Sequence, residues 1–240
     1  MSLVRRGAVL STVAASALVL SAAPAQAAAA PVINDTLATN IALGVSQSTS
    51  FTLAAKVTGA SSVTVVNART RADACDTWSE TLAKVDAHTF GDDFEAPADM
   101  FADHGGNDCA GPWRVTFTAK GTGGKATATA TYSVRRQARI TGFNASPEPV
   151  RKGAKVTVTG KLERASWDDG RYHGYAARTA ELQFKPVGGS YRTVKDVVGS
   201  STGTYRTTAT QKVKGCWRLV FRGSATTTSA KVAGDCVAVR

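Results

Sequence analysis

The chain of 240 residues lacks a long apolar run after its first 27 residues, so no later segment reaches the about 20 apolar residues that a membrane-spanning helix needs. It also lacks a sustained apolar stripe with the 3.6-residue period of an amphipathic helix. The catalytic patterns G-x-S-x-G and H-E-x-x-H are both missing. These absences argue against a membrane-spanning or helical fold, and we expect a protein that is not an enzyme.

The first 27 residues have the organisation of an export signal. Arg5 and Arg6 precede an apolar stretch over 8–23, and Ala25-Gln26-Ala27 offers the small-x-small pattern of a cleavage site. The arginine pair also suggests a twin-arginine signal, although its neighbours fit that pattern poorly. We therefore expect a signal peptide over 1–27 and a secreted, extracellular protein without a transmembrane anchor.

Cysteine is scarce, and no two of the four cysteines have the CxxC spacing that is typical of zinc and redox sites. An even number of cysteines in an exported protein indicates disulfides, and four cysteines permit three connectivities. We expect neighbours in sequence to pair, Cys75 with Cys109 and Cys216 with Cys236, because each bond then falls within one half of the chain. No thiol would then be left as a nucleophile.

An internal repeat divides the chain into two similar halves. Residues 111–117 (GPWRVTF) match 215–221 (GCWRLVF) at an offset of 104, and 45–57 match 150–162 at an offset of 105. In both pairs apolar and polar residues alternate, which is the period of a half-buried strand. The repeat predicts a duplicated β domain.

The rest of the second half supports this interpretation, since turn residues separate several short Thr- and Val-rich segments. Seven strands in about 100 residues are typical of an immunoglobulin-like sandwich. We therefore expect an all-β chain of two tandem immunoglobulin-like β-sandwiches. The strands predicted in the second half are 138–144, 154–163, 178–185, 190–197, 202–212, 215–222 and 230–239.

The two expected domains carry opposite net charge. The first, over 31–134, has 7 Lys and Arg against 11 Asp and Glu, a net charge of −4. The second, over 138–240, has 18 against 7, a net charge of +11. Between them, 135–139 form a short charged linker, for which we expect limited hinge freedom.

Strand parity places the second cysteine pair on the outer face of its sheet. If Trp217 points into the core, Cys216 points outward, and the alternation of the last strand places Cys236 outward as well. Strict register would put Asp235 opposite Trp217, so we expect a β-bulge near Gly234.

The second half resembles a family of exported actinobacterial proteins with tandem immunoglobulin-like domains. The resemblance rests on 144–153 (NASPEPVRKG), the following VTVTGKLERASW, the Gly-x-Trp-Arg strand and the closing GDCV over 234–237. It covers most of 138–240 and, more loosely, the region of Trp113. It implies a location in the bacterial cell envelope. Some similar sequences are labelled calcium-binding, a label that assigns no ligand residues here.

Residues 73–108, nearly all of which lie between the first two cysteines, hold ten acidic residues and one lysine. We interpret this segment either as a solvated acidic loop held by the disulfide or as a calcium site, because Ca²⁺ takes six to eight oxygen ligands. His88 and His104 lie beside Asp86 and Asp103, but their spacing fits no zinc pattern. The candidate calcium ligands are Asp92, Asp93, Glu95, Asp103, Asn107 and Asp108.

The basic second half suggests a polyanion partner, since clustered cations attract polyanions through counterion release. Trp167, Tyr172 and Tyr175 lie among these cations and would suit stacking on sugars or bases. The alternative is that the charges only keep the outer faces of the strands solvated. The candidate polyanion-binding residues are Arg151, Lys152, Lys155, Lys161, Arg164, Arg171, Arg218 and Arg222.

Two functions follow from these patterns. The first is a secreted, non-catalytic binding or structural module whose basic domain holds an anionic cell-wall polymer or another envelope protein. Nucleic acid has the same charge but is not the partner we expect. The second is a calcium-dependent interaction protein that uses 73–108.

Overall fold

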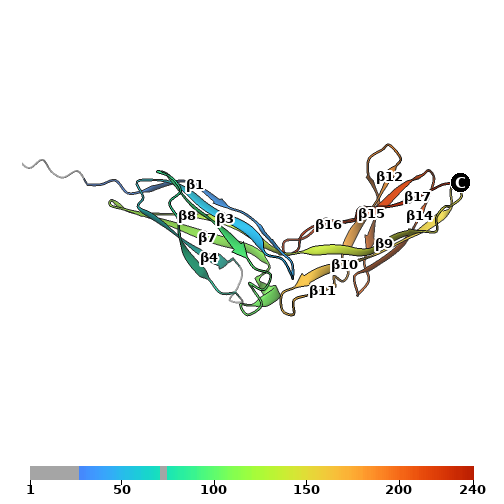
Figure 1. Cartoon of the computed structure of the whole chain (residues 1–240), viewed down its shortest axis with the longest axis horizontal. Helices are drawn as coiled ribbons and strands as arrows, with labels where there is room; N and C mark the ends of the chain where they lie inside the picture. The colour runs from blue at the N-terminus through green and yellow to red at the C-terminus, as the bar shows by residue number, and fades with distance from the viewer. Residues whose placement is uncertain (1–26, 71–74) are drawn as a thin grey trace, which may run out of the picture.

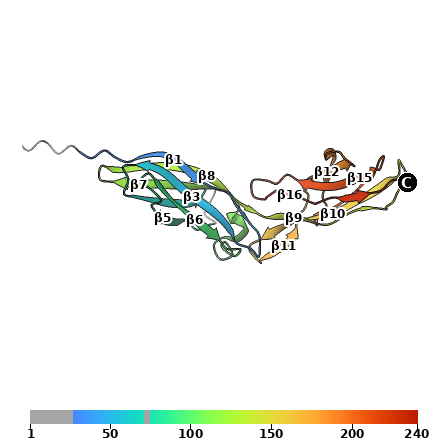
Figure 2. The same ribbon diagram turned by 45° about the horizontal axis from the view of Figure 1, so that its top comes forward.

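The structure, a computed structural model, describes residues 27–70 and 75–240, so the predicted signal peptide lies almost wholly outside the described residues. Two β-sandwiches follow one another along the long axis of the molecule (Figure 1). Figure 2, turned by 45°, shows the same end-to-end arrangement. Within the described ranges, no helix is long and apolar enough to cross a membrane.

The first sandwich packs a three-stranded sheet against a five-stranded sheet. The smaller sheet has the order β1-β3-β6, and the larger has the order β2-β8-β7-β4-β5, with β2 parallel to β8. The strands are β1 (Val32–Ala38), β2 (Ile41–Leu43), β3 (Thr49–Thr58), β4 (Ser62–Arg69), β5 (Trp78–Leu82), β6 (Thr89–Ala96), β7 (Gly111–Gly121) and β8 (Gly124–Arg136), and the 3₁₀ turn η1 is Gly106–Cys109.

The second sandwich has sheets of four and five strands. In one sheet β10 lies between β9 and β14 and extends to β11, and in the other the order is β13-β12-β15, with β16 and β17 both pairing with β15. The strands are β9 (Ala138–Ser146), β10 (Lys155–Ser166), β11 (Arg171–Gly174), β12 (Thr179–Pro186), β13 (Arg192–Val198), β14 (Thr204–Thr210), β15 (Gly215–Phe221), β16 (Ala230–Lys231) and β17 (Asp235–Val237).

The two sandwiches share one strand order, that of the immunoglobulin-like fold. The first, second and fifth main strands of each domain form one sheet (β1-β3-β6 and β9-β10-β14). The remaining strands form the other sheet, except for the short β11, which pairs with β10. The repeated sequences fall on equivalent strands, β7 with β15 and β3 with β10. The predicted all-β class and the tandem immunoglobulin-like sandwiches are therefore confirmed.

Alternation along the strands builds the two cores. Trp113, Val115 and Phe117 of β7 are at most 1% exposed, and they point between the sheets of the first domain. Trp217, Leu219 and Phe221 occupy the equivalent positions of β15 in the second domain. Burial of apolar surface, worth roughly 25 cal/mol per Å², is the main stabilising term in each core.

The acidic segment is not the loop that its composition suggests. It contains β5, β6 and η1, because apolar side chains recur between the acids and complete both sheets. Phe90, Phe94 and Ala96 of β6 all belong to the first core or pack against it. The interpretation of 73–108 as a solvated loop is therefore wrong for much of its length. The short strand β11 also escaped prediction.

Both expected disulfides are present, Cys75–Cys109 and Cys216–Cys236, and each lies within one domain. Cys216 and Cys236 are direct partners across β15 and β17. The predicted last strand is interrupted, and its register shifts by one residue between β16 and β17, near Gly234, as expected. Asp235 nevertheless lies opposite Trp217, and its Oδ2 accepts the backbone N–H of Ala145 at 2.7 Å.

Candidate functional site

A tryptophan of the second domain completes the core of the first. Trp167 lies in the turn between β10 and β11, is 2% exposed and belongs to the same buried cluster as the first-domain core. Its ring centroid is 5.0 Å from that of Phe101, and its Nε1–H donates to the carbonyl oxygen of Leu43 at 3.3 Å. We call this contact region, together with 136–137, the joint.

Polar contacts surround Trp167 on the side of η1. The backbone N–H of Asn107 donates to Asp168 Oδ1 at 2.8 Å, and its Nδ2 donates to Asp168 Oδ2 and to Ser166 Oγ. Its Oδ1 accepts the backbone N–H of Trp167 at 2.9 Å. Gly106 is required beside this contact, since a Cβ there would lie 1.9 Å from Asp168 Oδ1. Asn107 therefore holds the second domain against the first.

The linker is hydrogen-bonded to both domains. Arg136 is buried, its Nε–H donates to the carbonyl oxygen of Ala165 at 2.6 Å, and its backbone pairs with Thr226 and Thr228. The backbone N–H of Gln137 donates to Leu43 at 2.9 Å. Burial, together with the positive charge of Arg164, lowers the pKa of Arg136 to about 10. Rotation of the linker would break these contacts, and the limited hinge freedom expected from the sequence stays a prediction.

The aromatic side chains predicted to stack on sugars or bases are largely occupied. Trp167 is in the joint, and the ring of Tyr175 lies under Arg164 and Arg178 at 4.0 and 4.5 Å. Arg139 lies 4.0 Å from the centroid of Tyr172, whose hydroxyl donates to Gln137. The prediction that Trp167 stacks on a sugar or base is therefore wrong, because its indole is buried against the core of the first domain.

The eight candidate polyanion-binding residues do not gather on one face. Six lie on or next to β10 and β11, whereas Arg218 lies on β15 of the other sheet and Arg222 directly follows β15. Several are already paired: Arg222 with Glu181 at 2.7 Å, Lys161 with Glu163 at 3.2 Å, and Arg218 with the ring of Tyr191 at 3.7 Å. The Arg222 hydrogen bond lowers the pKa of Glu181 to about 2. Arg164 and Arg171 stand at the joint end of the domain, the first intermediate and the second exposed.

The remaining candidates, Arg151, Lys152 and Lys155, are exposed at the far end of the second domain, in and after the turn that precedes β10. The turn between β14 and β15 adjoins them, because the backbone N–H of Gly153 donates to Gln211 at 2.7 Å. That turn adds two exposed cations that the candidate set omitted, Lys212 and Lys214. We call Arg151, Lys152, Lys155, Lys212 and Lys214 the distal basic end.

The six candidate calcium ligands are spread over β6, η1 and the turns before η1. Asp92, Asp93 and Glu95 lie on β6, where each accepts a hydrogen bond, from Ala83, Thr52 and Ser48 respectively. Asp103 and Asp108 are exposed in the turns before and within η1, and Asn107 holds the joint. No three His, Cys, Asp or Glu side chains of 27–70 and 75–240 are grouped so as to hold a metal ion.

Calcium binding stays a prediction with a direct test. A ligand that binds only the native state raises the melting temperature. Extracellular calcium modules have dissociation constants of up to about 1 mM. If the acidic segment binds Ca²⁺, about 5 mM CaCl₂ should therefore raise the melting temperature of the first domain by several degrees, and a chelator should reverse the rise. MgCl₂ at the same concentration is the control, and an unchanged melt contradicts the prediction.

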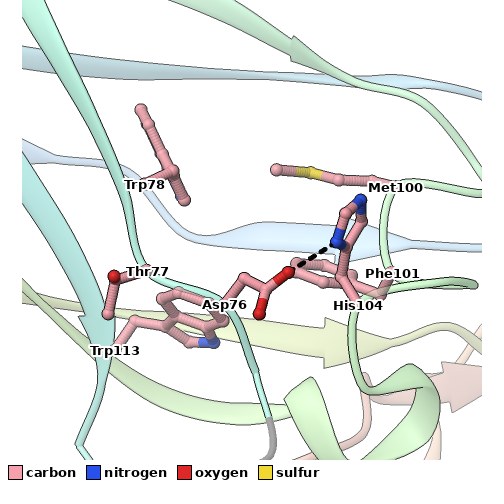
Figure 3. A pocket seen from close by; sticks show the side chains of 7 residues that line it. All are labelled: Asp76, Thr77, Trp78, Met100, Phe101, His104 and Trp113. Carbon is pink, nitrogen blue, oxygen red and sulfur yellow. Dashed lines mark hydrogen bonds and ion pairs between the residues drawn. The ribbon is translucent and has the colours of Figure 1, made fainter.

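An aromatic pocket of about 330 Å³ opens on the first domain, and sequence reasoning missed it. Figure 3 shows its lining, in which a hydrogen bond joins Asp76 and His104. The expected Cys75–Cys109 disulfide could have pointed to this pocket, because it brings the residues after Cys75 next to those before Cys109. The lining residues are Asp76, Thr77, Trp78, Met100, Phe101, His104 and Trp113.

No protein-family model matches this chain, and no curated protein matches it. Among solved structures it is similar to a chimeric titin Z1Z2 (15% identity, 90% of this chain and 99% of that chain, TM-score 0.26). It is also similar to the titin I-band fragment I67–I69 (12% identity, 87% and 65%, TM-score 0.34). At these TM-scores the likeness adds nothing to the fold, which rests on the strand order. The resemblance to an actinobacterial family stays a prediction, and tandem immunoglobulin-like organisation is what the structure establishes.

Proposed function

We propose that this protein is a secreted, non-catalytic module that binds anionic cell-envelope polymers through the distal basic end and holds its two domains in a fixed arrangement. The observation that carries the proposal is the position of those cations. They stand at the end of the second domain that faces away from the joint, and Arg151, Lys152, Lys212 and Lys214 are exposed. None of the five takes part in an ion pair among the described residues.

The held joint supports a structural contribution. Because Trp167 and Asn107 keep the domains end to end, a polymer bound at the distal basic end would place the acidic first domain at a defined distance from it. A flexible linker would not do so. Secretion is supported by the two disulfides, which form and persist in oxidising compartments. The partner is then an anionic wall polymer, with another envelope protein as the alternative.

A charge-neutralising triple variant tests this function. Replacement of Arg151, Lys152 and Lys214 by glutamine removes three of the five cations without touching a buried group. Binding to poly(glycerol phosphate) should weaken at least tenfold at low salt, since each cation near an anionic surface contributes about 1 kcal/mol. The slope of log K against log salt should fall by about 2, at roughly 0.7 per lost phosphate contact.

The matched control removes three exposed cations elsewhere in the same domain, Arg192, Arg206 and Lys231. It has the same net charge as the test variant. If both variants weaken binding equally, the interaction is one of overall charge and the distal basic end has no special part in it. If neither weakens binding, the proposed function is wrong.

A further inference from the structure

We propose that the aromatic pocket binds an organic cation, an ammonium or guanidinium group carried on an apolar stem. This inference concerns the first domain and goes beyond the proposed function, which uses the opposite end of the second. A side chain of Lys or Arg on a protein partner and a free alkylamine share this chemistry.

The pocket is formed by two segments that a disulfide joins. Asp76 to Trp78 lead into β5 on one side, and the turns over 97–105 supply Met100, Phe101 and His104 on the other (Figure 3). The Cys75–Cys109 bond connects the ends of these segments. A volume of about 330 Å³ is at the lower end of the range for small-molecule sites, which suits a single cationic group rather than a polymer.

The aromatic rings are held by their neighbours. Trp78 lies 5.5 Å from Phe94 and 6.1 Å from Phe51, both edge-on. Phe101 lies 5.9 Å from Trp113, whose Nε1–H donates to the carbonyl oxygen of Cys109 at 2.9 Å. Because the rings are packed before a ligand arrives, binding costs little side-chain entropy. The rings and the polarisable thioether of Met100 supply contacts that attract a cation and its stem.

A carboxylate stands at the opening. Asp76 Oδ2 lies 2.7 Å from His104 Nδ1, and the Asp76 side chain is 76% exposed, so an incoming cation can reach it. An ammonium group next to Asp76 would have both a carboxylate and aromatic faces within reach, the combination that recognises alkylammonium ligands.

The charge around the pocket favours cations over anions. Residues 75–108 carry nine Asp and Glu against one lysine, Lys84, and that lysine lies over the ring of Phe90. Among the residues that the structure describes, no Lys or Arg lines the pocket. An anion would meet repulsion, and a neutral ligand would desolvate the Asp76 carboxylate without compensating it. A neutral sugar ring is the remaining competitor, and the test includes one.

The test is an NMR titration of the full mature chain. Butylammonium and butylguanidinium should shift the indole N–H signals of Trp78 and Trp113 and the methyl signal of Met100, with dissociation constants in the millimolar range. Butyrate, butanol and glucose should bind at least tenfold more weakly. A blocked Gly-Lys-Gly peptide distinguishes the sources: tighter binding than butylammonium indicates a protein side chain, and equal or weaker binding indicates a free amine.

Asp76→Asn should weaken binding of butylammonium about tenfold, since it removes the charge at the opening and keeps the shape. Asp103→Asn is the matched control, because it removes one exposed charge of the same segment outside the pocket and should change the affinity less than twofold. Equal losses in the two variants, or butanol or glucose binding as well as butylammonium, would overturn the proposal. Neither outcome bears on the distal basic end.

Discussion

Replacement of Trp167 by alanine should destabilise the first domain, although the residue belongs to the second. Removing a fully buried tryptophan costs about 3–5 kcal/mol, because apolar contacts are lost and a cavity remains. The lost contacts are those with Phe101 and Leu43. Hydrogen exchange measures the effect by strand: the opening free energy of β7 amides should fall by about 3–5 kcal/mol, and that of β15 amides by much less.

Val198→Ala is the control, since Val198 lies in the second domain and is 65% exposed. It should change neither set of amides by more than about 0.5 kcal/mol. Small-angle scattering on the Trp167→Ala chain should also show a broader distribution of interdomain distances than on the parent chain. Destabilisation confined to β15, with β7 unchanged, would mean that Trp167 is not part of the first core.

Removal of the Cys75–Cys109 disulfide should also strongly destabilise the first domain. Replacement of Cys75 and Cys109 by alanine opens a loop with a sequence separation of 34, which corresponds to about 4 kcal/mol in the chain-entropy account. Cys109 is also buried, so the loss should reach the core that it contacts. The opening free energy of β7 amides is again the measurement. Because the bond joins the two sides of the aromatic pocket, the pocket should lose its shape as well.

Replacement of Cys216 and Cys236 by alanine is the paired experiment. Its loop has a sequence separation of 20, which corresponds to about 3 kcal/mol, and the destabilisation should appear in β15. The aromatic pocket should be unaffected. If both double variants destabilise the same strands to the same degree, the two bonds do not act within their own domains.

The strands were predictable where polar and apolar residues alternate without interruption. Trp113, Val115 and Phe117 identify β7, and the repeat identifies β15 at once. β6 was harder, because Asp92 and Asp93 interrupt the alternation of Phe90 and Phe94 and suggest a loop. Acidic residues occur on the solvent-facing side of a strand as well as in turns, so their presence alone does not distinguish the two.

The sites were less predictable, because they depend on contacts between distant residues. The acidic residues around Asn107 in the sequence suggest a calcium ligand. In the fold, however, Asn107 hydrogen-bonds to Trp167 and Asp168, which are 60 and 61 residues away. The basic residues in and beside β10 and β15 look equivalent in sequence, but the fold pairs Arg222 with Glu181 and leaves Lys152 exposed. Charge counts predict the sign of a surface, and only the fold shows which charges are available.

The placement of Trp167 also bears on how the protein is made and how it can evolve. Synthesis proceeds from the N-terminus, so residues 31–134 exist as a chain before the turn after β10 does. The core of the first domain is therefore complete only after Trp167 of the second domain has been synthesised. The two domains share one strand order but are thereby unequal: exchanging or deleting either would leave the other with an unfilled space or an exposed indole.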